Sequence, residues 1–174
     1  YLPAAPLSDR SRYTFGDLLS VMERLRRADD GCPWDREQTH QTLREYLIEE
    51  AYEVVEAIDS GDDERIADEL GDVLLQVVFH AQVAAEHGTF GISDVTTAIC
   101  RKMITRHAHI FGDVRCDTAE DVIRSWEVIK KKEKGLRETA EVMRDVPGHL
   151  PALMRAAKVQ KKARQVGFDW DNPG

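Results

Sequence analysis

Two pairs of carboxylates with the same spacing stand out in the sequence. Glu50 and Glu53 form one pair, and Glu69 and Asp72 form the other, each in a segment whose apolar residues recur with helical periodicity. Because residues three apart on an α-helix share a face, each pair directs two carboxylates to one side. Four converging carboxylates repel one another unless a cation lies among them, and hard oxygen ligands select Mg²⁺ or Mn²⁺ over zinc. Since bound Mg²⁺ usually takes further ligands from substrate phosphates, the pattern predicts metal-dependent chemistry on a phosphorylated small molecule.

A solvated helix face is the alternative interpretation of the same stretch. From Glu45 to Asp72, twelve Asp and Glu residues are opposed by one basic residue, Arg65. Two features favour a metal site: both pairs flank apolar stripes, and a short turn at 60–62 makes the two helices antiparallel neighbours. Carboxylates beside a core are costly unless they are compensated, so metal binding is the better interpretation.

Basic and aromatic residues that could contact a nucleotide follow later in the sequence. Lys102 and Arg106 are four residues apart in one expected helix, and Trp126 and Lys130 are four apart in the next. Such cations recognise phosphates, and the face of a Trp ring can stack on a nucleobase. Surface salt bridges and a core Trp are the alternatives for each residue alone. The sequence has no catalytic triad pattern and no phosphate-binding loop motif, so it does not indicate a protein nucleophile.

Composition limits the class of protein. A chain of 174 residues with 42% hydrophobic content predicts one core. Its net charge of −8 argues against binding to nucleic acid or to an anionic membrane, because both need a basic field. No run approaches the ~18 apolar residues of a membrane span. Three scattered cysteines do not form a disulfide framework, and a cytoplasmic location is expected.

The periodicity predicts an all-α protein. Helices are expected over about 14–27, 39–59, 63–87, 93–107, 118–134 and 151–166, and no stretch alternates as a strand would. Apolar stripes on the second and third helices are expected to face the core; they consist of Leu47, Ala51, Val54 and Ile58, and of Ile66, Leu70, Val73, Leu74, Val77 and Ala81.

The third expected helix carries more apolar residues than one core face needs. Almost every position from Val73 to Ala85 is apolar, including the side away from the stripe. We therefore predict that Leu75, Val78, Phe79 and Val83 contribute to a subunit interface, since a large exposed apolar patch would promote aggregation. The expected state is a homo-oligomer, at least a dimer.

These residues together resemble the MazG nucleoside triphosphate pyrophosphohydrolases of the all-α NTP pyrophosphatase superfamily. The resemblance covers about residues 15–170, and the matching stretches are Gly31-Cys32-Pro33-Trp34-Asp35 with Gln38-Thr39, the ExxE of 50–53, the ExxD of 69–72, Lys102 through Phe111, Trp126-Glu127 with Lys130, and Leu150 through Trp170. It implies a MazG-like helical bundle with a four-helix core and accessory helices, dimerising through its long helices. It also implies Mg²⁺-dependent hydrolysis of an NTP or dNTP to NMP and pyrophosphate, a house-cleaning activity.

The resemblance also implies roles for individual residues. Those expected to bind metal are Glu50, Glu53, Glu69 and Asp72, and those expected to contact the nucleotide are Lys102, Arg106, Trp126 and Lys130. Catalysis is assigned to Glu50 and Glu53 together with Lys102 and Arg106, and Glu49 and Gln76 are expected just behind the metal ligands. Either Glu50 or Glu53 could orient the attacking water. The number of metal ions and the preferred base and sugar remain open.

The expected domain organisation is a leader at 1–13, a MazG-like domain at 14–148, and a basic helix with a linker at 149–174. Both ends look like cuts in a longer polypeptide. Two other functions remain as alternatives: another all-α pyrophosphohydrolase of the dUTPase-like or phosphoribosyl-ATP type, or a non-catalytic module whose acidic stretch binds a basic partner. Thermal melting with and without Mg²⁺ and nucleotide separates an enzyme from such a module, because a metal site stabilises the fold by mass action.

Overall fold

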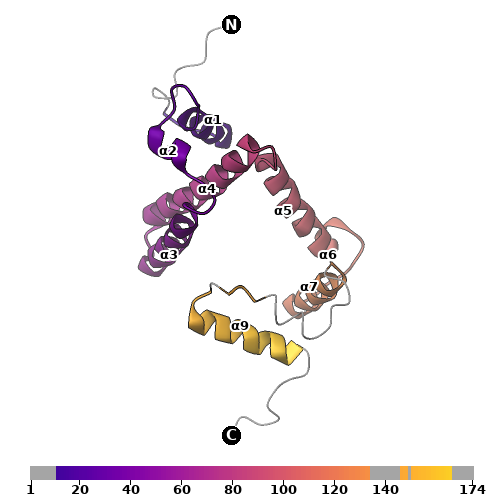
Figure 1. Ribbon diagram of the computed structural model, residues 1–174. Helices are drawn as coiled ribbons and strands as arrows, with labels where there is room; N and C mark the ends of the chain where they lie inside the picture. Colours follow the sequence, from indigo (N-terminus) through magenta and orange to yellow (C-terminus); the bar gives the residue numbers. More distant parts are fainter. Residues whose placement is uncertain (1–10, 134–145, 149, 166–174) are drawn as a thin grey trace. The chain divides into compact units, whose positions relative to one another are not determined.

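The protein is described by a computed structural model, which covers residues 11–133, 146–148 and 150–165 (Figure 1). Every regular element in these residues is an α-helix, which confirms the all-α prediction. The helices are α1 (Phe15–Leu25), α2 (Pro33–Glu37), α3 (Arg44–Ser60), α4 (Asp63–Glu86), α5 (Ile92–Arg106), α6 (Ala108–Phe111), α7 (Ala119–Glu133) and α9 (Ala152–Gln165). The sequence patterns missed α2 and α6, since helices of five and four residues are too short to show a period.

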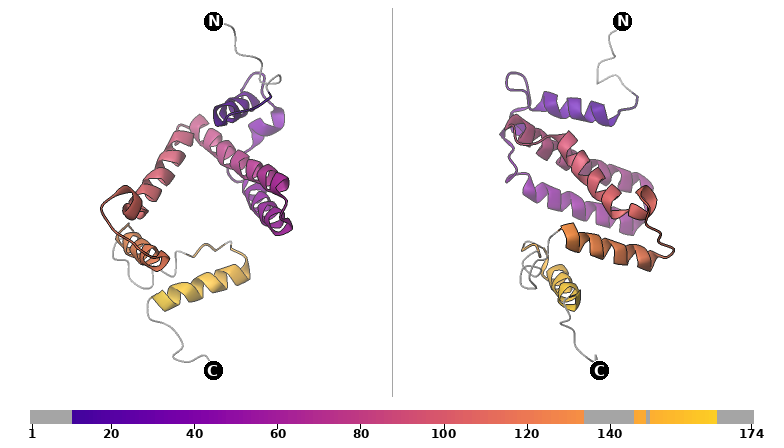
Figure 2. Two further views of the ribbon diagram at one scale, coloured as in Figure 1. Left: turned by 180° about the vertical axis from the view of Figure 1, so that it is seen from behind. Right: turned by 90° about the vertical axis from the view of Figure 1, so that its right-hand side faces the viewer.

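A tight turn joins α3 to α4 and makes them an antiparallel hairpin. Gly61 ends α3 in the left-handed conformation, with φ of 71°, which a glycine adopts without steric cost. Asp62 then caps α4, because its carboxylate accepts hydrogen bonds from the amides of Glu64 and Arg65. The two long helices therefore lie side by side, as Figure 2 shows.

The core lies where α1 packs on the end of this hairpin. It consists of the buried residues Met22, Leu43, Val78, Phe79 and Val83, surrounded by Leu18, Leu19, Leu75 and Ile92. A capping box between Thr14 and Asp17 starts α1. The apolar side chains of this helix then pack against α4. Burial in α4 is confined to its second half, from Gln76 onward.

The choice of subunit-interface residues on α4 is wrong, because these residues pack within their own chain. Phe79 is 3% exposed and belongs, with Val78 and Val83, to the core of its own chain. Of the predicted core stripe, Ala81 is buried as expected, but Leu70 is 51% and Leu74 is 40% exposed in this chain. The reason is α1: its Leu18, Leu19 and Met22 cover the side of α4 that periodicity alone had left without a partner.

On α3, too, the buried face differs from the predicted one. Leu47 and Ile58 of the predicted stripe are exposed, whereas Ala57, which lies outside the stripe, is fully buried. The face of α3 that meets α4 is thus the flank that carries Glu50, and the apolar stripe lies beside it. Position in a stripe showed where apolar residues cluster but not which neighbour covers them.

The chain divides into two compact units, with the boundary between Arg101 and Lys102 inside α5. In the second unit, Thr118 caps α7, since its hydroxyl oxygen accepts a hydrogen bond from the amide of Asp121. Among the described residues, no helix is long and apolar enough to cross a membrane. The expected domain limits at 13/14 and 148/149 stay predictions.

Candidate metal and nucleotide site

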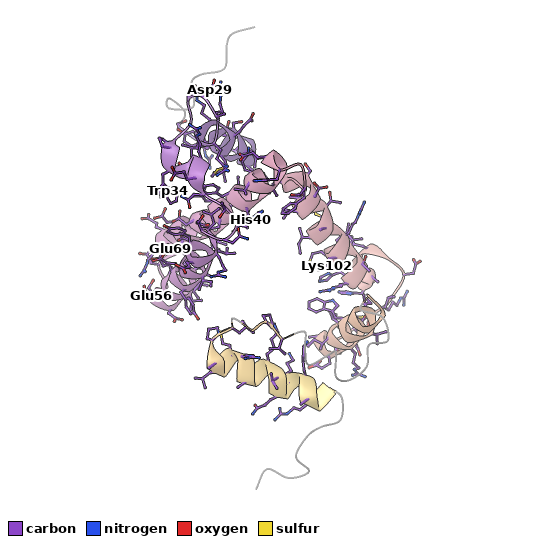
Figure 3. All side chains as sticks on the ribbon, in the orientation of Figure 1. Asp29, Trp34, His40, Glu56, Glu69 and Lys102 are labelled. Carbon is purple, nitrogen blue, oxygen red and sulfur yellow. The ribbon has the colours of Figure 1, made fainter. Side chains whose placement is uncertain are left out.

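Three of the four predicted ligands meet between α3 and α4. One carboxylate oxygen each from Glu50, Glu69 and Asp72 lies within 4.8 Å of the other two. The two helices contribute from opposite sides, as the hairpin prediction required, and Figure 3 shows Glu69 on α4 within this hairpin. Three carboxylate oxygens at such spacing match the hard, oxygen-rich coordination that Mg²⁺ and Mn²⁺ prefer.

Burial of its helical neighbours explains how α3 aims Glu50 at α4. Leu43 and Ala57, seven residues before and after Glu50, share its face of the helix and are both almost fully buried. The small side chain of Ala57 allows the helices to approach closely there. Glu50 is consequently half-buried beside α4 rather than on the solvent side.

The site is electrostatically strained as it stands. The pKa of Glu50 is raised above its ordinary value, first by burial and then by the negative charge of Asp72, with further contributions from Glu53 and Glu49. A raised carboxyl pKa means that the protein resists placing another negative charge here. A divalent cation would reverse this effect, because it favours the ionised form of each carboxylate.

Glu53 and Glu49 stand apart from the three converging residues. Both are exposed. Glu53 shares a hydrogen bond with the carboxyl group of Glu50, but it does not belong to the cluster of three. Glu49 acts on Glu50 through its charge alone. The assignments of Glu53 to the metal and of Glu49 to a place just behind the ligands therefore stay predictions.

Arg65, the basic residue of the acidic run, links the two helices at one end of the site. Its guanidinium donates to Glu56 at 2.8 Å and lies 3.5 Å from Glu69. Glu56, labelled in Figure 3, is exposed on α3 and takes part in this ion pair. Sequence spacing predicts the contact within α4, since Arg65 and Glu69 are four residues apart, but not the contact with α3.

Gln76 lies on the same flank of α4 as Asp72, one helical turn further along. It is 6% exposed, and its Oε1 atom has no hydrogen-bond partner among the described residues. A buried amide oxygen without a donor is unusual in proteins and calls for an explanation such as a water or an ion. Together with the three carboxylates, this acceptor fits a hydrated divalent metal.

The segment before α3 brings aromatic residues to the hairpin (Figure 3). The exposed ring of Trp34 makes edge contacts with Tyr46 and Phe79, at 6.0 and 6.5 Å between ring centroids. His40 stacks on His80, with 2.8 Å between their Nδ1 atoms. This pair could not be predicted from the sequence, because the two residues are 40 positions apart and no local pattern connects them.

Arg26 holds that segment in place. Its guanidinium is almost completely buried, pairs with the carboxylate of Glu86 at 2.7 Å, and donates to the backbone carbonyls of Asp35 and Gln38. It also lies over the ring of Phe79, 5.5 Å from the centroid. The hydrogen bonds from Arg26 hold the pKa of Glu86 below its ordinary value.

The expected nucleotide contacts belong to the second unit or to its boundary. Lys102 is exposed on α5, and Arg106 is half-buried at the end of the same helix. Trp126 on α7 is half-buried and meets the ring of His107 edge-on, 5.0 Å between centroids. Lys130 also lies on α7, but its side chain is outside the described residues. Their roles in binding substrate stay predictions.

Comparison with known proteins places the hairpin within a defined domain. Residues 38–111 match the MazG nucleotide pyrophosphohydrolase domain, so the matched segment includes all three converging carboxylates. Over 159 residues, 91% of this chain and 60% of the relative, the sequence is 48% identical to the nucleoside triphosphate pyrophosphohydrolase/pyrophosphatase MazG of Thermotoga maritima.

Other relatives have similar descriptions. The nucleoside triphosphate pyrophosphohydrolase of Escherichia coli K12 is 46% identical over 90% of this chain and 60% of its own length. That of Mycobacterium tuberculosis H37Rv is 39% identical over 96% of this chain and 50% of its own length. This chain thus spans about half to three fifths of these relatives. The resemblance inferred from the motifs is confirmed, and the chain belongs to the MazG family of nucleotide pyrophosphohydrolase domains.

Proposed function

We propose that this chain hydrolyses nucleoside triphosphates, NTP or dNTP, to the nucleoside monophosphate and pyrophosphate with Mg²⁺. The observation that carries the proposal is the convergence of Glu50, Glu69 and Asp72 inside a MazG domain. The relatives' names, nucleoside triphosphate pyrophosphohydrolase, support the substrate class and the reaction.

The three converging carboxylates would hold Mg²⁺, with Mn²⁺ as a substitute, and the bound ion would polarise a phosphate oxygen and acidify a water. Glu53 is assigned to the attacking water, because its carboxylate reaches that of Glu50 yet stands outside the cluster. There it orients the water toward the α-phosphorus and accepts its proton.

Lys102 and Arg106 are assigned to the phosphates. They lie four residues apart on α5 and can therefore point to one side of that helix. Their charges offset the negative charge that develops on the leaving pyrophosphate. Lys130 is assigned the same task, and Trp126 is assigned to the nucleobase.

The active form is proposed to be a homodimer that pairs through the hairpin. Leu47 and Ile58 on α3, and Leu70 and Leu74 on α4, leave a large apolar area exposed in a single chain. Leu70→Glu should lower the molar mass measured by light scattering while the helical circular dichroism signal is retained. An unchanged mass would exclude Leu70 from the interface.

Product analysis tests the proposed reaction. The chain, incubated with Mg²⁺ and a panel of purified NTPs and dNTPs, should release NMP and pyrophosphate in equal amounts, and chelation of the metal should stop the release. Phosphorus NMR separates the products without a coupling enzyme. Release of NDP and orthophosphate, or no turnover of any nucleotide, would contradict the proposal.

A further inference from the structure

Packing alone does not explain why a polar side chain, that of Gln76, is buried in α4. Gln76 is the first buried residue of α4, close to Val78 and Phe79 in sequence, yet its side-chain oxygen has no donor among the residues that the structure describes. A Leu or Met would fill the same space without that cost. The buried amide therefore indicates a hydrogen-bond partner such as a water or an ion.

The position of Gln76 indicates what that partner is. Asp72 precedes it by four residues and Glu69 by seven, so all three side chains project from one flank of α4. The carboxylates of Asp72 and Glu69 converge with that of Glu50. The unpartnered oxygen thus lies one helical turn from the proposed metal site, on the side toward the core.

A hydrated Mg²⁺ ion needs hydrogen-bond acceptors around it. Mg²⁺ gives up its waters reluctantly and keeps several of them in protein sites. Each retained water directs its protons away from the metal and needs acceptors for them. Among the described residues, the buried Gln76 oxygen is an acceptor without a donor, so it is available to such a water.

We infer that Gln76 Oε1 accepts a hydrogen bond from a water held on the metal at Glu50, Glu69 and Asp72. This inference rests on the proposed function, because it needs a metal among those carboxylates. Gln76 acts as a positioning residue: it fixes one water of the hydrated ion through its side-chain oxygen and makes no contact with the nucleotide. Partners of this kind typically change metal affinity by 10- to 100-fold.

Binding of Mg²⁺ alone, measured by titration calorimetry without nucleotide, tests the role of Gln76. Gln76→Met keeps the size of the side chain and removes the acceptor, so Mg²⁺ should bind about tenfold more weakly or worse. In chelator the same variant should be at least as stable as the parent protein toward urea, because an unpartnered buried acceptor is gone. Gln82→Met, a change of a half-buried Gln on the same helix, is the control and should leave Mg²⁺ affinity unchanged.

Gln76→Glu provides the rescue. It restores an acceptor oxygen at the same place, so Mg²⁺ should bind at least as tightly as in the parent, while the metal-free fold should be less stable because a further carboxylate joins the cluster. A Gln76→Met protein that binds Mg²⁺ like the parent would overturn the inference. A second combination of results would also overturn it: Gln76→Met is less stable than the parent in the presence of chelator, and Gln76→Glu does not restore Mg²⁺ binding. Together these results would show that Gln76 acts only in packing.

The parent protein and Asp72→Asn separate this inference from the proposed function. If the parent binds Mg²⁺ and Asp72→Asn weakens the binding, the metal site stands, and an unaffected Gln76→Met would refute the role of Gln76 alone. If the parent does not bind Mg²⁺, the metal site and the inference fail together.

Discussion

The two halves of α4 differ in their packing partners and in how deeply they are buried. In the first half, residues 63–75, the helix packs against α3, carries Glu69 and Asp72, and has no fully buried residue. In the second half, residues 76–86, it packs against α1 as well, and it contains all the buried residues of the helix: Gln76, Val78, Phe79, Ala81, Val83 and Ala84. The two halves of the helix therefore differ in role: the second half anchors the fold, and the first half carries two carboxylates of the proposed metal site.

The largest effect on stability is therefore expected in the second half. Phe79→Ala removes a ring that is 3% exposed from the core and should lower the free energy of unfolding by about 3–5 kcal/mol. Urea denaturation followed by circular dichroism measures it. In the first half, Leu74→Ala removes a side chain that is 40% exposed, and under monomeric conditions it should cost less than about 1 kcal/mol. Equal losses from both variants would show that the two halves do not differ in packing.

The largest effect on activity is expected in the first half. Asp72→Asn should reduce Mg²⁺-dependent turnover by on the order of 100-fold or more, since it removes a ligand charge at the proposed metal site. Its stability in chelator should be unchanged or higher, because Asp72 raises the pKa of Glu50 by repulsion. The matched control is Asp68→Asn, an exposed acid on the same helix, which should retain its activity. Retention of near-normal turnover by Asp72→Asn would remove Asp72 from the site.

The sequence predicted the helices and the convergence of three carboxylates better than it predicted the packing. Spacing placed Glu50, Glu69 and Asp72 on facing flanks, because i, i+3 geometry within a helix and a short turn between helices are local properties. It failed for Phe79 and Leu70, because the side of α4 that becomes the core depends on where α1, some 50 residues earlier, comes to rest. His40 and His80 show the same limit, since contacts over such separations leave no periodic trace.

A loss of stability of intermediate size is expected from Arg26, which links the end of α4 to the segment before α3. Arg26→Met leaves Glu86 without its main partner and frees the carbonyls of Asp35 and Gln38, so the free energy of unfolding should fall by roughly 2 kcal/mol. Chemical denaturation at neutral pH measures this loss. Arg24→Met breaks only an exposed ion pair and should cost less than about 0.5 kcal/mol. A cost for Arg26→Met no larger than that of Arg24→Met would argue against this anchor.

The smallest effect is a pH dependence of the metal-free protein. The pKa of Glu50 is higher in the folded chain than its ordinary value of 4.5, so the folded protein binds this proton more tightly than the unfolded chain does. The contribution of Glu50 to stability is therefore present below pH 4.5 and is lost as the pH rises through the raised pKa. Melting temperatures in chelator should show this loss in the parent but not in Glu50→Gln. The same slope in both proteins would assign the effect to other groups.

Amide hydrogen exchange with and without Mg²⁺ tests most directly whether the first half of α4 holds the metal. The account predicts that Mg²⁺ slows exchange in α3 and in residues 63–75 of α4, and that exchange in residues 77–86 changes little because the core already protects them. The difference should disappear in Asp72→Asn. Protection by Mg²⁺ that is absent from the hairpin, or that persists unchanged in Asp72→Asn, would contradict a metal site at Glu50, Glu69 and Asp72.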